Sequence, residues 1–121
     1  MRDALIFWLS SRYSVDQLSD ELFKLTLETS NSRTQIVLVS VWRENFTVMS
    51  PFAPFNAKNA GSILEAVAGS TVLGVSIFNG FFVVTSSSTS LDGPVLDSLI
   101  SAVGETADEI EAQLTRGADN L

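Results

Sequence analysis

Two apolar runs joined by Asn79-Gly80 form the most regular pattern in the sequence, at residues 72–78 and 81–86. Asn and Gly adopt the positive φ angles of a type I′ turn at low cost, so this pair between β-branched and aromatic runs predicts a β-hairpin. No charged side chain occurs between Glu65 and Asp92. We therefore expect the hairpin to be covered on at least one face.

A second pair of strands is predicted upstream. Residues 34–42 are almost wholly apolar and β-branched, which is typical of a central strand covered on both faces. After a short polar break, residues 46–50 form its antiparallel neighbour, and the prolines at 51 and 54 end that strand because proline cannot donate to a ladder. Phe52 and Phe55 beside these prolines either close the end of the core or stand exposed as a contact site.

Residues 14–28 fit two patterns. Ser14 with Gln17 resembles a helix capping box, and the apolar residues that follow keep helical spacing. Between residues 23 and 27, however, apolar and polar side chains alternate, as in a strand. We predict a short turn followed by a strand at residues 22–28.

Three segments carry the spacing of helices. Residues 2–12 are apolar nearly all round, and residues 56–68 form a short, weakly apolar helix that ends before a glycine. Residues 94–115 are the clearest case, because their apolar side chains step alternately by four and three positions: Leu96, Ile100, Val103, Ala107, Ile110 and Leu114. This last helix should bury one stripe of its surface.

These elements predict the order α-β-β-β-α-β-β-α. The fold class is then α+β, with a single antiparallel sheet and helices packed on the sheet. The 121 residues are enough for one core and too few for two, so we expect one domain, residues 1–121.

Composition limits the chemistry and the partners. The chain has no cysteine and no histidine, which removes disulfides, thiolate sites, the usual general base and the usual zinc ligand. Its net charge of −7 lies in one half, because residues 1–60 are balanced whereas residues 61–121 hold eight acidic side chains and one Arg. No basic stripe is present, so we expect no nucleic acid and no membrane as partners, while a basic polypeptide would be steered to the acidic half. The apolar run at residues 4–9 is too short for a signal peptide, and we expect a cytoplasmic protein.

Two polar clusters invite a chemical interpretation. Residues 86–90 place five hydroxyl groups in a row, but no glycine loop or Lys accompanies them, which favours a solvated strand end over a phosphate site. The last helix carries a group of acidic side chains with no second helix to supply matching metal ligands: Glu105, Asp108, Glu109 and Glu111. We predict no catalytic residue, no metal and no cofactor, and hence no enzyme.

With this element order the chain resembles a known family, the YbjN-like branch of the type III secretion chaperone fold, which is described as bacterial sensory transduction regulators. The resemblance rests on residues 33–39 (RTQIVLV), 50–53 (SPFA), 80–84 (GFFVV) and 102–111 (AVGETADEIE). It extends over nearly the whole chain, and its motifs are core and turn signals without a catalytic signature.

The resemblance implies a small acidic protein that dimerises and holds a client polypeptide along apolar grooves and strand edges, without chemistry. We expect client contacts through an open sheet edge and four aromatic side chains: Trp42, Phe46, Phe52 and Phe55. The homodimer contact is expected on the uncharged hairpin, at Val75 and Ile77. A regulatory domain that senses a small molecule in a pocket between helices and sheet is the alternative function.

Overall fold

The computed structural model describes residues 2–30, 33–42, 45–58, 60–67, 74–88 and 93–119. Within these ranges the chain forms three helices and six strands, in the order α1 (Arg2–Arg12), β1 (Val15–Gln17), β2 (Leu22–Glu28), β3 (Thr34–Trp42), β4 (Asn45–Pro54), α2 (Ala60–Val67), β5 (Gly74–Phe78), β6 (Phe81–Ser88) and α3 (Gly93–Asp119).

All six strands belong to one antiparallel sheet, in the spatial order β1-β2-β3-β4-β6-β5. This confirms the predicted α+β class with a single antiparallel sheet, and it confirms β2 as a strand. The predicted element order lacked one strand, since β1 pairs with residues 23–25 of β2. With three residues, β1 is too short for its sequence to show an alternating pattern.

β4 extends further than its sequence predicts. We expected it to end at residue 50, but it continues through both prolines to Pro54 and pairs there with β6, with a shift of register between Pro51 and Ala53. Its pairing with β3 stops at Met49. The prolines therefore fall where β4 has a ladder partner on one side only, so that their missing N–H groups are tolerated.

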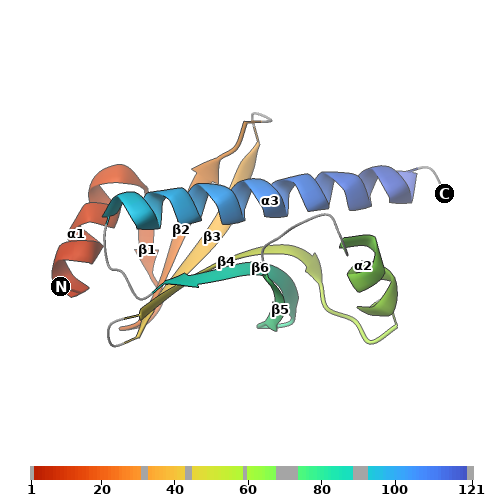
Figure 1. Ribbon diagram of the computed structural model, residues 1–121, viewed down its shortest axis with the longest axis horizontal. Coiled ribbons are helices and arrows are strands. Elements are labelled where there is room, and N and C mark those ends of the chain that lie inside the picture. Colours follow the sequence, from red (N-terminus) through yellow and green to blue (C-terminus); the bar gives the residue numbers. More distant parts are fainter. Residues whose placement is uncertain are drawn as a thin grey trace.

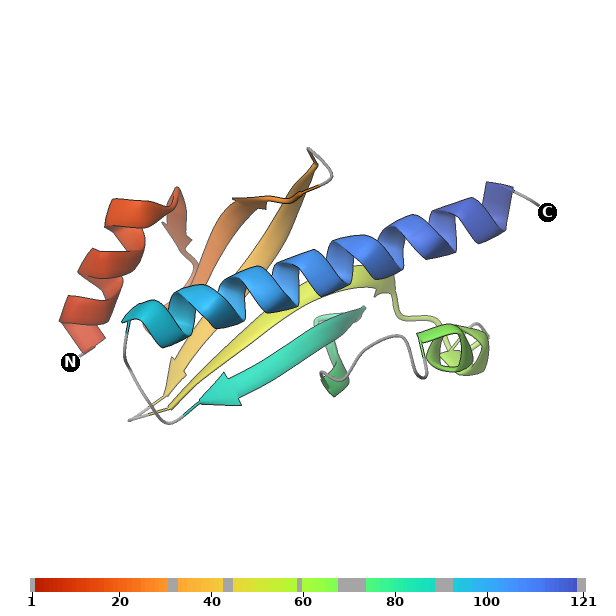
Figure 2. The same ribbon diagram turned by 45° about the horizontal axis from the view of Figure 1, so that its top comes forward.

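The helices lie mainly on one face of the sheet (Figures 1 and 2). α3 runs the length of the molecule across β3, β4 and β6, α1 packs beside the N-terminal end of α3, and α2 lies beneath its C-terminal half. In the described part of the chain, no helix covers the other face, which we call the open face. The molecule thus has two layers, with the core between α3 and the sheet.

The core confirms the predicted stripe on α3. Its apolar side chains Leu96, Ile100, Val103, Ala107 and Ile110 are almost completely buried and contact the inward-facing side chains of the strands: Phe23, Leu25, Val37, Val39, Val41, Phe46, Val48, Phe82 and Val84. Met49 and Val83 are buried as well but do not belong to this cluster, because alternation along the strands turns them to the open face.

The predicted hairpin is formed by β5 and β6. Asn79 and Gly80 connect the strands with φ angles of 49° and 81°, as a type I′ turn requires. β6 pairs with β4 over its whole length, through Ser88, so residues 86–88 of the hydroxyl run form the end of this strand. Among the strands that the structure describes, β5 is the last in the sheet and forms one of its edges.

The backbone of α3 lies close to strand side chains at Gly104. A Cβ atom at this position would collide with Leu27 Cδ2 and lie 3.2 Å from Val37 Cγ2. Glycine therefore permits a contact between helix backbone and strand side chains that any larger residue would disturb.

Candidate functional site

The aromatic residues expected to bind a client do not form one surface. Phe46 and Phe52 are 1% and 5% exposed and belong to the core, which corrects the expectation of a surface role. Both alternate to the face of the strand that α3 covers, a property that their position in the sequence does not disclose. Phe55 is 40% exposed and packs edge-on against Phe82, with ring centroids 5.5 Å apart. The side chain of Trp42 lies outside the described part of the structure.

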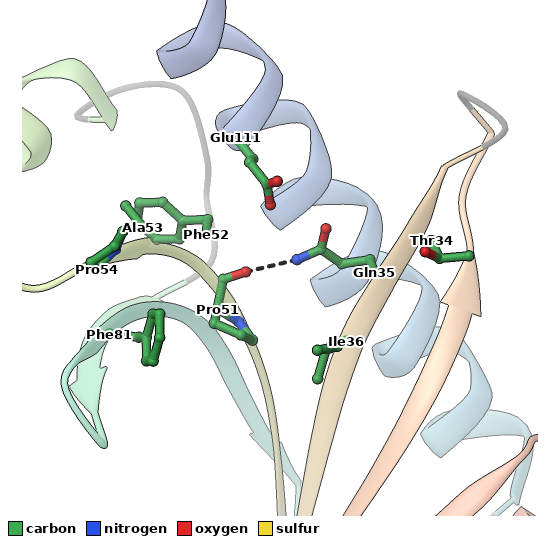
Figure 3. A pocket seen from close by; sticks show the side chains of 9 residues that line it. All are labelled: Thr34, Gln35, Ile36, Pro51, Phe52, Ala53, Pro54, Phe81 and Glu111. Atoms are coloured by element: carbon green, nitrogen blue, oxygen red, sulfur yellow. Dashed lines mark hydrogen bonds between the residues drawn. The ribbon is translucent and has the colours of Figure 1, made fainter.

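β3 and β4 separate at one end and leave a cleft between them. The ladder that joins the two strands runs only from Trp42 and Asn45 to Leu38 and Met49. Beyond this point β3 stays with β2, while β4 follows β6. Figure 3 shows the two strands diverging, with the side chains that line the resulting space, which we call the β3–β4 cleft.

A side-chain amide spans the base of the β3–β4 cleft. Gln35 Nε2 donates hydrogen bonds to Pro51 O at 2.7 Å and to Ser50 Oγ at 3.0 Å. Ser50 Oγ in turn donates to Ile36 O at 2.6 Å. These bonds replace the missing ladder and hold the strands at a fixed separation, because both Gln35 and Ser50 are buried.

The cleft encloses about 330 Å³, at the lower end of the roughly 300–1,000 Å³ typical of ligand sites. Most of its lining is apolar, and it draws on three strands and one helix: Thr34, Gln35, Ile36, Pro51, Phe52, Ala53, Pro54, Phe81 and Glu111. Ile36 and Phe81 are among the exposed large apolar side chains of the protein. Such a space can accept an apolar group without rearrangement of the fold.

Charged groups surround the end of the cleft where α3 passes. Arg33 Nη2 lies 3.2 Å from Glu111 Oε1, and Arg33 Nε lies 3.2 Å from Asp108 Oδ1. The Asp108 side chain is fully buried, and its Oδ2 accepts a hydrogen bond from Thr29 Oγ1 at 3.1 Å. One guanidinium thus serves two carboxylates, one buried and one at the cleft.

A second hollow, of about 430 Å³, lies between α2 and the edge strand β5. Its lining consists of Leu64, Val75, Ser76, Ile77 and Phe82. Ile77 is 51% exposed, whereas Val75 is half-buried and packs against the core. The two residues expected at a dimer contact thus share one side of the β5 edge with Leu64.

A polar cluster joins α1 to the start of α3. The hydroxyl of Tyr13 donates a hydrogen bond to Asp97, which also pairs with Arg12 at 3.4 Å. Burial, with further contributions from the Asp97 hydrogen bond and charge, raises the pKa of Tyr13 to about 12. The hydrogen bond from the protonated phenol to Asp97 connects the end of α1 to the start of α3.

Among the described residues, no three His, Cys, Asp or Glu side chains lie close enough together to hold a metal ion, and no helix is long and apolar enough to cross a membrane. Comparison with known proteins gives no match: no family model, no curated protein and no solved structure is significantly similar to the chain. The candidate sites therefore rest on their geometry alone.

Sequence reasoning missed Gln35 and did not connect Glu111 with the cleft. Two signals could have pointed to the cleft: the single amide in an almost wholly apolar central strand, and the two prolines three residues apart in the strand beside it. Both show that the regular ladder is interrupted, but only the folded chain places Glu111 next to them.

Proposed function

We propose that the protein is a non-catalytic polypeptide-binding module, a chaperone-like or regulatory adaptor that holds a client segment as a homodimer. The observation that carries the proposal is the β3–β4 cleft, where two strand edges separate around an apolar space that is open to solvent. Exposed strand edges and apolar pockets are the means by which extended peptides are bound in many unrelated proteins. Membership of the YbjN-like family belongs to the same proposal and is supported by the element order, with β1 as an addition.

The open face adds apolar surface next to the cleft. Ile36, which is exposed, and Leu38, which is half-buried, project from β3 on this face, away from the core cluster. A client segment that leaves the cleft along β3 would therefore pass over apolar side chains.

The dimer is proposed to form at β5. This edge has five residues, none of them charged and none of them proline, so it lacks the features that usually prevent edge-to-edge pairing. By contrast, the opposite edge, β1, has three residues and carries Asp16. An antiparallel pair of two β5 strands centred on Ser76 would set Val75 against Ile77 of the second copy, as a twofold-symmetric contact requires.

Light scattering during size-exclusion chromatography tests the dimer. The unmodified protein should elute with the mass of a dimer, and Ile77→Lys should elute as a folded monomer because the new charge would be buried at the contact. Thr26→Lys, at an exposed position on β2, is the matched control and should remain dimeric. A monomeric unmodified protein, or a dimeric Ile77→Lys variant, would contradict this part of the proposal.

Fluorescence anisotropy with a library of labelled, extended peptides tests the binding function. Some of these peptides should bind reversibly without nucleotide, and a library in which none binds would refute the function. The volume of the cleft gives a specific reason to keep the alternative of a small-molecule sensor. In that case at least one compound in a metabolite screen would raise the melting temperature of the protein, while peptides would not.

A further inference from the structure

We infer that the hollow between α2 and β5 binds a small apolar molecule without net charge, and that this ligand stabilises the dimer proposed at β5. The inference rests on that dimer and adds a ligand that would regulate it. Three features carry it: the apolar lining of the hollow, its position on the covered side of the edge strand, and the two residues that it shares with the dimer contact.

The lining of the hollow is apolar. Phe82 is 1% exposed, whereas Leu64 and Ile77 are 47% and 51% exposed and reach the solvent. Among the described lining residues, Ser76 alone is polar and none is charged. The sequence has no charged side chain in residues 66–91, so the residues that join α2 to β5 add none. A charged ligand would therefore lose its hydration without gaining a partner, whereas an apolar ligand would remove exposed apolar side chains from water.

The hollow has the size of a small-molecule site. Its volume of about 430 Å³ falls within the roughly 300–1,000 Å³ that is typical of ligand pockets. Its walls are anchored to the core, because Ile63 and Val67 of α2 belong to the core cluster and Val75 of β5 packs against it. A ligand therefore needs to order little of the protein when it binds.

The hollow lies on the side of β5 that faces the core. Val75 pairs with Val84 and Ile77 with Phe82, and both of these partners belong to the core cluster, so Val75 and Ile77 project to the covered face. In the proposed antiparallel pair of β5 strands centred on Ser76, Ile77 of the second copy stands opposite Val75 on this same face, with Cβ atoms about 4.5–5.5 Å apart. The second copy therefore adds an apolar wall to the hollow.

A ligand in the hollow is thus buried more completely in the dimer than in the monomer. A ligand that binds one state more tightly shifts the equilibrium toward that state. The ligand therefore favours the dimer and, by linkage, the dimer binds the ligand more tightly than the monomer does. A client that requires the dimer would then be held in response to the ligand.

The test measures the dissociation constant of the dimer by analytical ultracentrifugation of the full chain, with and without decanol below its solubility limit. Saturating decanol should lower this constant by about fivefold or more. Leu64→Trp, which fills the hollow from α2, should abolish the effect while the protein remains dimeric. Leu18→Trp, the same change at an exposed position outside the hollow, is the matched control and should retain the effect.

Isothermal titration calorimetry with decanol and decanoate tests the charge of the ligand. Decanoate has the same chain length and should bind more weakly, because no described residue of the lining is basic and the charged residue of α2, Glu65, is acidic and exposed. Equal affinities of decanol and decanoate would show that the assignment to an uncharged ligand is wrong.

A dimer whose dissociation constant is unchanged by decanol would overturn the inference and leave the dimer itself intact. The same holds for a decanol effect that persists in Leu64→Trp. Dissociation of the dimer by decanol would also overturn the inference, since the ligand would then compete with the β5 contact. A protein that is monomeric both with and without decanol would instead refute the dimer of the proposed function, and with it the inference.

Discussion

Replacing Gln35 by Leu should destabilise the protein, because the Gln35 amide connects β3 to β4 by hydrogen bonds at the point where the two strands separate. The change removes two hydrogen bonds, to Pro51 O at 2.7 Å and to Ser50 Oγ at 3.0 Å. Each neutral bond contributes about 0.5–1.5 kcal/mol net. Since Pro51 is only half-buried, water can reach its carbonyl in the variant, so the penalty of an unsatisfied group is small there. The expected loss is therefore about 1–3 kcal/mol of the free energy of unfolding, or a melting temperature lower by about 3–12 °C for a chain of this size.

Urea unfolding followed by circular dichroism measures the effect, with Gln113→Leu on the exposed side of α3 as the matched control. The control should stay within about 0.5 kcal/mol of the unmodified protein. Ser50→Ala provides a second check. Because Ser50 Oγ links Gln35 to Ile36 O, the double variant should lose less than the two single variants together. A Gln35→Leu variant that is as stable as its control would refute the view that the Gln35 hydrogen bonds hold β3 and β4 at the cleft. Strictly additive losses in the free energy of unfolding of the two single variants would refute it as well.

Two further predictions concern the contacts of α3. Gly104→Ala should destabilise the protein or leave its stability unchanged, because overpacking of about 1–3 kcal/mol against Leu27 offsets a gain in helix propensity of about 1 kcal/mol. In a Leu27→Ala background the same change should stabilise the protein, as measured by urea unfolding. If Gly104→Ala has the same effect on the free energy of unfolding in both backgrounds, the close contact with Leu27 is contradicted. Tyr13 has a pKa raised to about 12 in the folded state, so the stability it contributes is fully present below pH 10 and is lost as the pH rises toward 12. Tyr13→Phe should remove this part of the alkaline decline in melting temperature, and an unchanged alkaline profile would show that the phenol is not shielded.

The elements with strong local signals could be predicted from the sequence. The Asn79-Gly80 turn defines the hairpin because few residue pairs accept two positive φ angles, and the apolar stripe of α3 repeats over five turns. The strand at residues 22–28 can be distinguished from a helix because apolar and polar side chains alternate regularly along it. In each case the pattern that predicts the element lies within the segment itself.

The cleft could not be predicted in the same way, since it depends on contacts between distant segments. Whether β4 ends at Pro51 or continues depends on the presence of β6 on one side and the absence of β3 on the other. The same register turns Phe46 and Phe52 inward and leaves Phe55 exposed, although all three are aromatic residues near a strand end. Composition alone does not distinguish these outcomes, because the side-chain period of a strand fixes the buried face only once its neighbours are known.

Binding of an extended polypeptide in the β3–β4 cleft can be observed by titrating the ¹⁵N-labelled protein with a peptide that binds in the anisotropy assay and following the backbone amide signals. We expect the signals of Thr34, Gln35, Ile36 and Phe81 to shift in a saturable way, while those of α1 and β1 stay in place. Saturable shifts confined to other elements, or no shift at peptide concentrations that saturate binding in solution, would contradict it.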